Sequence, residues 1–335
     1  MKHFAFDDQI ASQFEAVSSV LRSIEVPALD PKRPVIFAGI GTSLHACKVA
    51  AYWVAELSGG RLRPAAVETH DYALRGEIRA EDQIVVVSHR GTKRFPHELF
   101  ERAKRVGALT IAVSGNGAQN PGGDVVLRTC GDEKASTHTV SYLTALAVLG
   151  RLVAKLVGDG ASKFEAALEK IPTAIQETLA KPAPTGILPR LINREPIFLT
   201  GFGIDELSVT EAALKIKEGA YLWAEAMSVE LALHGTPAAF EPRMAAITVV
   251  PNIDDGGRTA ALRGLLLELG VEVLTVGTGD CDLPFAEVDY LLRPFVAIIP
   301  LQRLVAELAR RRGSNPDTTR EDVEPWKAAT ARIRL

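Results

Sequence analysis

The stretch PVIFAGIGTS, residues 34–43, is an apolar run of strand type that leads directly into a glycine turn with two hydroxyl side chains. The same form returns as PIFLTGFGID at residues 196–205, where the two glycines keep their spacing. A strand, a glycine turn and a helix in this order are typical of an open parallel α/β sheet. The repetition therefore predicts two copies of one α/β unit in the chain.

Two later pairs of segments reproduce the order of elements. RVGALTIAVSGNG (105–117) is matched by ELGVEVLTVGTGD (268–280), and RLVAKL (151–156) recurs as RLVAEL (303–308). Within each copy, short β-branched runs alternate with longer segments of helical period. This alternation predicts an α/β fold of the flavodoxin-like, doubly wound kind, with helices on both faces of a parallel sheet.

The repeat also sets the domain boundaries that we expect. An N-terminal helix and the first domain take residues 1–160, and a linker helix with a proline-rich turn takes 161–192. The second domain follows at 193–313, and a C-terminal tail at 314–335. A length of 335 residues suits two hydrophobic cores, because a single core stops growing at about 300 residues.

The composition excludes several classes of protein. A hydrophobic fraction of 47% and a net charge of -3 are typical of a globular protein and not of a disordered or nucleic-acid-binding one. The three cysteines form no CxxC pair, which argues against a disulfide framework and a thiolate zinc site. The most apolar run, VSYLTALAVLG, stops at Arg151, and we see no export signal. We expect a cytoplasmic protein without membrane or nucleic-acid partners.

Hydroxyl side chains follow the first strand. Thr42 and Ser43 begin a helix, where hydroxyl and backbone N–H groups can hold a phosphate or simply cap the helix. A dinucleotide site is the rival interpretation of this turn, but Leu44 stands where a third glycine is needed. Glu68, at the end of the next strand, would hold the ribose in that alternative.

Basic groups follow the third strand in SHRGTK, residues 88–93. Solvated loop charges are common, so the loop alone does not demand a function. Ser136 and Thr137 precede the last helix of the first copy and would reach the same edge of the sheet. The candidate side chains of the SHRGTK loop are Ser88, His89, Arg90 and Lys93.

The second copy carries a stripe of charges on one helix. Glu211, Lys215 and Glu218 stand at i, i+4 and i+7 in TEAALKIKEGAYLWAEA and so share a face. Such a stripe is usually a surface ion-pair ladder. His234 follows in LALHGTP, a turn in which an imidazole can face a cleft or can merely cap the turn.

Taken together, these segments resemble the sugar isomerase (SIS) domain proteins. The resemblance is strongest to the double-SIS isomerase half of glucosamine-6-phosphate synthase and to the related sugar-phosphate deaminases and fructosamine-6-phosphate deglycases. It runs over nearly the whole chain, through GIGTS, AST at 135–137, ALKIKE, AEA and HG in family order. It implies two tandem SIS domains and a phosphosugar isomerase or amino-sugar-phosphate deaminase that needs neither metal nor cofactor.

The resemblance implies a role for each candidate residue. Glu218 would move the proton between C1 and C2, Lys215 would stabilise charge on the intermediate, and His234 would open the sugar ring from the other subunit of a homodimer. Lys327, at a displaced spacing in the tail, would correspond to a lysine that enters the site in relatives. The phosphate would bind at Thr42, Ser43, Ser88, Ser136 and Thr137.

The SHRGTK loop departs from the family pattern. Relatives carry Ser-Gln-Ser-Gly-Glu-Thr at this place, so that only Ser88 and Gly91 are preserved. We expect the loop still to hold an anion, with Arg90, Lys93 or His89 supplying the charge. This implies a different ligand or a second anionic group on the ligand.

The sequence leaves isomerisation, deamination and deglycation open. The chain begins MKHFAF and reaches its first expected strand by residue 35, so we expect no glutaminase domain and a glutamine-independent reaction. A non-catalytic sugar-phosphate-binding regulator is the alternative, although the set of Lys215, Glu218 and His234 argues against it. A metal-dependent enzyme ranks third, because the histidines are scattered and no HExxH occurs.

Overall fold

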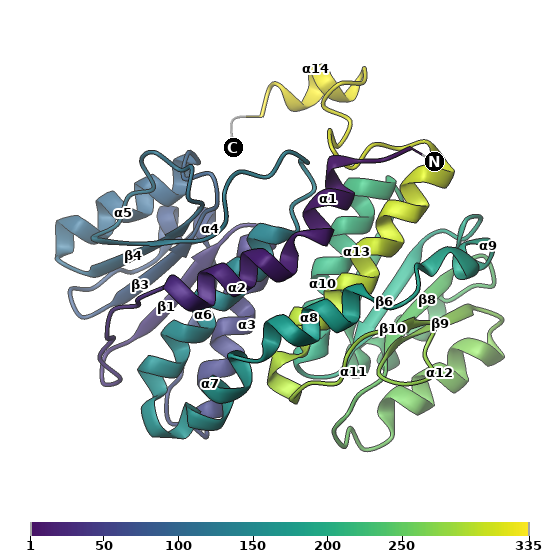
Figure 1. The fold of residues 1–335 in the computed structure, drawn as a ribbon, viewed down its shortest axis with the longest axis horizontal. Helices are drawn as coiled ribbons and strands as arrows, with labels where there is room; N and C mark the ends of the chain where they lie inside the picture. Colours follow the sequence, from purple (N-terminus) through teal and green to yellow (C-terminus); the bar gives the residue numbers. More distant parts are fainter. Residues whose placement is uncertain (1, 334–335) are drawn as a thin grey trace. The chain divides into compact units, whose positions relative to one another are not determined.

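The computed structural model describes residues 2–333, which form two parallel five-stranded sheets (Figure 1). The strand orders are β2-β1-β3-β4-β5 and β10-β9-β8-β6-β7. Read from the corresponding edge, the second order places its strands as the first does, which is the flavodoxin-like order. The predicted fold class is confirmed.

The chain divides into two compact units, each with one sheet. The first unit, with β1 to β5, contains residues 12–133, 139–172 and 333. The second unit, with β6 to β10, contains residues 2–11, 134–138 and 173–332. Each unit is described by itself below.

The sheet of the first unit has three buried central strands and two partly exposed edges. Every residue of the central strands β1 and β3 is buried, as expected for a parallel sheet that is covered on both faces. The edge strands β2 and β5 include exposed residues. The five strands are β1 (Val35–Gly39), β2 (Ala65–Glu68), β3 (Gln83–Val87), β4 (Leu109–Ser114) and β5 (Val125–Arg128).

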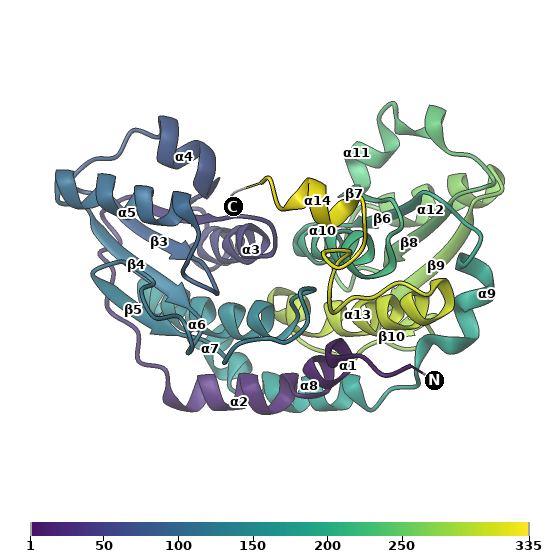
Figure 2. The same ribbon diagram turned by 90° about the horizontal axis from the view of Figure 1, so that it is seen from above.

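Helices cover both faces of this sheet (Figure 2). Ile84 and Leu99 belong to an apolar cluster under α4 and α5, whereas Val87 and Val113 point to the opposite face, toward α3 and α6. Alternate residues of one strand thus serve two cores. The helices of the first unit are α2 (Gln13–Ser23), α3 (Thr42–Leu57), α4 (Thr69–Arg75), α5 (Arg94–Val106), α6 (Val140–Val157), η1 (Gly158–Ala161) and α7 (Ser162–Leu168), and α8 (Ile171–Leu179) leads into the second unit.

The second unit repeats this arrangement. Phe198 and Val273 pack under α11 and α12 on one face, and α10 and α13 pack together. Its strands are β6 (Ile197–Gly201), β7 (Ala224–Ser228), β8 (Ala245–Val249), β9 (Glu272–Gly277) and β10 (Leu283–Pro284). Its helices are α1 (Ala5–Ala11), η2 (Pro184–Ile187), α9 (Leu188–Leu191), α10 (Ile204–Lys215), η3 (Ile216–Ala220), α11 (Val229–Leu233), η4 (Thr236–Ala239), α12 (Arg258–Glu268), η5 (Tyr290–Leu292), α13 (Arg293–Arg312) and α14 (Trp326–Thr330).

The repeated glycines are required where strand meets helix. A Cβ added at Gly39 or at Gly201 would lie 2.5 Å from a backbone carbon of the following helix. Gly41 and Gly203 have positive φ angles of 55° and 56°, which residues with a side chain rarely adopt. The two turns are alike because the same close approach of helix to strand is made twice.

The most apolar helical stretch begins at Val140 with α6. It is long and apolar enough to cross a membrane by composition, but 83% of its most apolar window is buried inside the protein. A helix that is apolar on all sides and covered by protein is typical of the core of a large α/β domain.

Candidate functional site

A small cavity lies in the first unit where β1 and β3 diverge toward opposite edges of the sheet. Thr42 and Ser43 at the start of α3 line it together with Ser141 at the start of α6, and His89 and Thr129 line it from the loops after β3 and β5. Two helix N-termini, with their positive partial charge, therefore end at one cavity. The strand order reverses at this point, which is where open α/β sheets bind ligands.

Thr129 is a member of this cavity that the sequence analysis missed. The residue is 8% exposed, and its Oγ1 has no hydrogen-bond partner within residues 2–333. Buried hydroxyls are nearly always hydrogen-bonded in folded proteins, so this one is suited to a ligand. Its place directly after a strand was the available signal.

Glu133 caps the start of α6. Its Oε1 accepts hydrogen bonds from the backbone N–H groups of Thr139 (2.8 Å) and Val140 (2.7 Å), and its Oε2 accepts one from that of Ser141 (3.1 Å). The corresponding N-cap of α3 is Gly41, which has no side chain to cap the helix. The protein's own carboxylate thus satisfies α6, which favours α3 as the anion-binding terminus.

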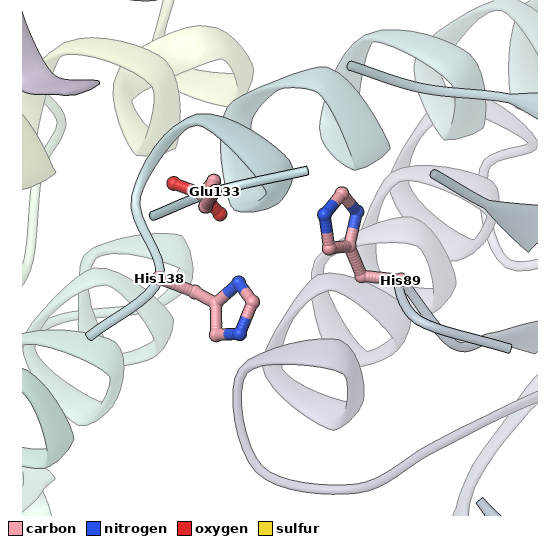
Figure 3. A group of neighbouring side chains, drawn as sticks. All are labelled: His89, Glu133 and His138. Atoms are coloured by element: carbon pink, nitrogen blue, oxygen red, sulfur yellow. The ribbon is translucent and has the colours of Figure 1, made fainter. Parts of the chain in front are cut away.

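Figure 3 shows His89 close to Glu133, with a ring nitrogen and a carboxylate oxygen within 4.8 Å of each other. His138, which the figure also draws, belongs to the segment 134–138 that groups with the second unit. Imidazole and carboxylate are both metal-ligand types, but three backbone N–H groups already hold this carboxylate as a helix cap. The expectation of a metal-independent site stays a prediction.

The structure divides the predicted residues of the SHRGTK loop. His89 lines the cavity with Thr42 and Ser43, whereas Arg90 lines a separate, larger cavity of the same unit. Ser88 is buried, and its carbonyl oxygen accepts a hydrogen bond from the Ser114 hydroxyl. Lys93 is the N-cap residue of α5 and lines neither cavity.

In the second unit, Lys215 bridges two carboxylates. Its Nζ lies 2.5 Å from Oε2 of Glu218 and 3.4 Å from Oε1 of Glu211. The side chains of Lys215 and Glu211 are 1% and 0% exposed, and that of Glu218 is 29% exposed. A surface ion-pair ladder is therefore the wrong interpretation of this stripe, and Glu218 is the member that a ligand can reach.

Glu218 lies in a π-helix, η3, that directly continues α10. Single π turns of this kind are frequent at functional sites. Gly219 makes the turn possible beside α13, because an added Cβ would lie 2.4 Å from Val305 Cγ1. Tyr221 then ends the turn with a positive φ of 57°. Glu218 lies three residues after Lys215, and the two side chains meet at the start of this turn.

The C-terminal tail connects the AST segment to this π-helix within the second unit. The backbone N–H groups of Ser136 and Thr137 donate to the carbonyls of residues 317 and 316, at 2.9 and 3.1 Å. The Ser314 hydroxyl donates to the carbonyl of Gly219 at 2.8 Å. Thr137 Oγ1 is buried and has no partner in the part of the chain that the structure describes. The tail thus supports both predicted segments.

His234 and Lys327 lie outside this arrangement. The His234 side chain is 69% exposed, and its Nδ1 lies 3.3 Å from Oε1 of Glu230. In the described chain no hydrogen bond or ion pair joins His234 to Glu218. Lys327 is exposed on α14.

The cysteines are poor nucleophiles. Burial raises the pKa of the Cys47 and Cys281 thiols, and it raises that of Cys130 to about 12. A thiol must lose its proton to attack, so all three stay unreactive near neutral pH.

Comparison with known proteins gives a consistent result. Residues 28–154 match the family model described as SIS domain. The glutamine–fructose-6-phosphate aminotransferase (isomerizing) of Thermococcus kodakarensis is 27% identical over 94% of this chain and 55% of its own length. That of Pyrococcus horikoshii is 27% identical over 85% of this chain and 50% of its own length. The chain spans about half the length of the curated relatives that it matches.

Solved structures share the fold. The C-terminal domain of glucosamine-fructose-6-phosphate aminotransferase from Francisella tularensis superposes with a TM-score of 0.83 at 20% identity, covering 94% of this chain and 98% of that one. A glucosamine-6-phosphate deaminase from Thermotoga maritima gives 0.77 at 19% identity, covering 94% and 97%. Tagatose-6-phosphate ketose/aldose isomerase from Escherichia coli gives 0.75 at 16%, covering 93% and 95%.

Proposed function

Because this chain belongs to the SIS-domain family, we propose that it acts on a phosphosugar and moves a proton between C1 and C2, as an aldose–ketose isomerase or an amino-sugar-phosphate deaminase. The observation that carries the proposal is the pair of Lys215 and Glu218, 2.5 Å apart, with the amine buried and the carboxylate partly open. The similar proteins include an isomerase and a deaminase by name, so the pair is assigned to the step that both reactions share.

Glu218 is the proposed base. Transfer of a proton from one sugar carbon to the next needs a single group that removes it and returns it, and a carboxylate within hydrogen-bond reach suits this role. The 29% exposure of its side chain leaves it accessible to a substrate, while the contact with Lys215 fixes its direction. Free rotation would spoil this geometry, so the π-helix that carries Glu218 belongs to the catalytic arrangement.

Lys215 is the proposed electrostatic partner. Removal of the proton leaves negative charge on the sugar oxygen of an enediol or on the corresponding enolamine, and a fixed ammonium nearby stabilises that charge. Glu211, fully buried at 3.4 Å from the Lys215 Nζ, holds the amine from the other side. We therefore assign Glu211 a positioning role.

Thr42 and Ser43 are the proposed phosphate ligands, at the start of α3. The N-cap of α3 is a glycine, which makes no side-chain cap, and the two hydroxyls and the buried Thr129 Oγ1 line the cavity at that terminus. His89 lines the same cavity and is the member of the SHRGTK loop that we assign to it. Ser136 and Thr137 remain proposed ligands on the tail side of the second unit.

His234 is proposed to open the sugar ring in the site of a second subunit of a homodimer. An imidazole can exchange a proton with the ring oxygen near neutral pH. The exposed position of His234 on its own subunit is compatible with a role in the site of the second subunit. Lys327 stays a predicted site residue, to be tested after the other three.

Proton NMR in D2O tests the proposal. Glucosamine 6-phosphate and fructose 6-phosphate are each incubated with the protein, and exchange at C1 and C2 and release of ammonium are followed. We expect exchange with at least one sugar, and Glu218→Gln should slow it by about 100-fold or more, because the variant keeps the shape but not the base. Glu268→Gln, at an exposed glutamate of α12, is the matched control and should keep the wild-type rate.

The outcome also separates the two classes of function. Binding of a phosphosugar without any exchange would favour the alternative, a non-catalytic sugar-phosphate-binding regulator. Exchange that survives Glu218→Gln would remove Glu218 from the mechanism. Ammonium release from glucosamine 6-phosphate distinguishes a deaminase from an isomerase.

A further inference from the structure

A second and larger cavity lies in the first unit, beside the SHRGTK loop. It has a volume of about 710 Å³, is open to solvent, and is lined by the loop after β3 (residues 89–92), the loop after β4 (residues 117–120) and the end of the segment that follows β5 (residues 132 and 133). His97 of α5 completes the wall. His89 lines both this cavity and the one at the start of α3, so the two are neighbours.

The walls of this cavity are braced by the protein. Nε2 of His97 lies 2.8 Å from the carbonyl oxygen of Gly91, which fixes the first loop to α5. Nη1 of Arg128 donates to the carbonyls of Gly115 (2.9 Å) and Ala118 (2.7 Å), which fixes the second loop to β5. A cavity with such walls keeps its shape without a ligand.

Two glycines let the loops close on one another. Gly91 has a positive φ of 63°, and an added Cβ would lie 3.0 Å from Pro121 Cα in the second loop. A Cβ at Gly117 would lie 2.7 Å from Oδ2 of Asp132. The Asp132 carboxylate is thus packed against a backbone that has no side chain, and its place in the wall is defined.

Opposite charges face this cavity from different walls. Arg90 lies on the first loop and Asp132 on the segment after β5, and both side chains are exposed. Among the described residues neither side chain has a hydrogen bond or an ion pair, whereas neighbouring Arg94 and Glu98 pair at 2.6 Å. The two charged side chains thus line one cavity from different walls, and they are not paired with each other.

The chemistry of the occupant follows from these charges. A purely anionic ligand would suit Arg90 but would meet the carboxylates of Asp132 and Glu133, and a purely cationic ligand would meet Arg90. A ligand that carries one positive and one negative group can avoid repulsion by like charges at both places. A guanidinium matches a carboxylate in a two-point contact, and a carboxylate matches an ammonium group.

We propose that this cavity binds an α-amino acid group, with its carboxylate on Arg90 and its ammonium on Asp132. The amide side chains of Gln119 and Asn120 line the same cavity and would contact polar atoms of the side chain. The group belongs either to a free amino acid or to an amino acid joined to the phosphosugar that we assign to the neighbouring cavity. The binding site itself does not depend on the proposed isomerase or deaminase chemistry.

Calorimetric titration of the full chain tests this site without any sugar. The probes are alanine, serine, glutamine and lysine, and then the amide and the N-acetyl derivative of the tightest binder, which each lack one charge. We expect a Kd on the order of 1 mM for at least one free amino acid, and binding about tenfold weaker for each derivative. Absence of binding by all four amino acids would overturn the proposal.

Two variants assign the charges. Arg90→Gln should weaken the amino acid about tenfold and leave the amide, which has no carboxylate, unchanged; Asp132→Asn should do the same for the amino acid and leave the N-acetyl derivative unchanged. Arg22→Gln, an exposed arginine on α2, is the matched control. If both variants weaken the amino acid, its amide and its N-acetyl derivative equally, Arg90 and Asp132 do not contact the carboxylate and the ammonium group of the ligand, and the proposal is wrong.

A competition titration separates the two sources of the amino acid group. Simultaneous binding with fructose 6-phosphate supports a free amino acid, and mutual exclusion supports one ligand that spans both cavities. Failure of the phosphosugar to bind would count against the proposed function alone, because the amino acid titrations use no sugar.

Discussion

At the scale of single residues, one substitution separates the two glycine turns. Ser43 in the first turn corresponds to Asp205 in the second, counted from the paired glycines. The Asp205 carboxylate lies 2.8 Å from Nε of Arg293, and both side chains are buried, at 0% and 1% exposure. The second turn therefore holds an internal carboxylate where the first offers a hydroxyl, which leaves the first turn as the one suited to an external anion.

This buried ion pair gives a stability prediction. Burial raises the pKa of Asp205 even though Arg293 opposes the shift. The free-energy cost of removing the Asp205 charge from water is therefore large. Asp205→Asn would leave the buried Arg293 charge without a counter-charge, although its Nη2 still donates to the Val250 carbonyl, and we expect a loss of about 3–5 kcal/mol in the free energy of unfolding. The double variant Asp205→Leu with Arg293→Met should recover most of this loss, because apolar groups of similar size need no partner.

Denaturant unfolding of the three variants measures the effect. Asp280→Asn, an exposed aspartate in the same unit, serves as the control and should stay within about 0.5 kcal/mol of the parent. A loss below about 1 kcal/mol in Asp205→Asn would mean that water or another group reaches Arg293.

At the scale of elements, what the sequence predicts is what local rules determine. The strands and the two glycine turns follow from apolar runs and from the need for a close approach of helix to strand, and both signals are contiguous in the chain. The cap of α6 by Glu133 and the braces of Arg128 depend on loops that meet only after the sheet has formed. These contacts were therefore not predictable from spacing.

The π-helix shows the same limit at the candidate site. The spacing of Glu211, Lys215 and Glu218 predicts that they share one helix face, but spacing alone cannot show whether that face is exposed to solvent or buried. Packing of η3 against α13 decides it, through contacts such as that of Gly219 with Val305. The resemblance to a known family identified the pair before geometry did.

Gly219 provides a prediction about this element. Gly219→Ala should force the π turn off α13, with an expected cost of about 1–3 kcal/mol and a clear loss of C1–C2 exchange, because Glu218 moves with the turn. Val305→Ala combined with Gly219→Ala removes the clashing methyl group and should restore part of the exchange rate. Thermal unfolding and the NMR exchange assay measure both effects, and Gly264→Ala on α12, where an added Cβ meets nothing within 4 Å, is the control.

At the scale of the whole molecule, two sheets of the same order carry different polar groups. The first unit gathers hydroxyls and an uncapped helix terminus, which suit binding of an anion, and the second holds a lysine between two carboxylates, which suits proton transfer. Neither unit alone contains all the residues to which we assign a role in the proposed reaction. Under the proposed function, His234, which is exposed on its own subunit, would act in a second copy of the chain.

Complementation between two inactive variants tests that arrangement. Glu218→Gln and His234→Gln are co-expressed with different affinity tags, and the resulting population is assayed for C1–C2 exchange. If His234 acts in the site of its partner, a mixed dimer has one site with both defects and one intact site, so an equal mixture should regain about a quarter of the wild-type rate. If His234 acts within its own subunit, every site keeps one defect and no activity returns. Native mass spectrometry of the sample purified on both affinity tags establishes that mixed dimers are present. Absence of C1–C2 exchange in that sample would then count directly against a shared site.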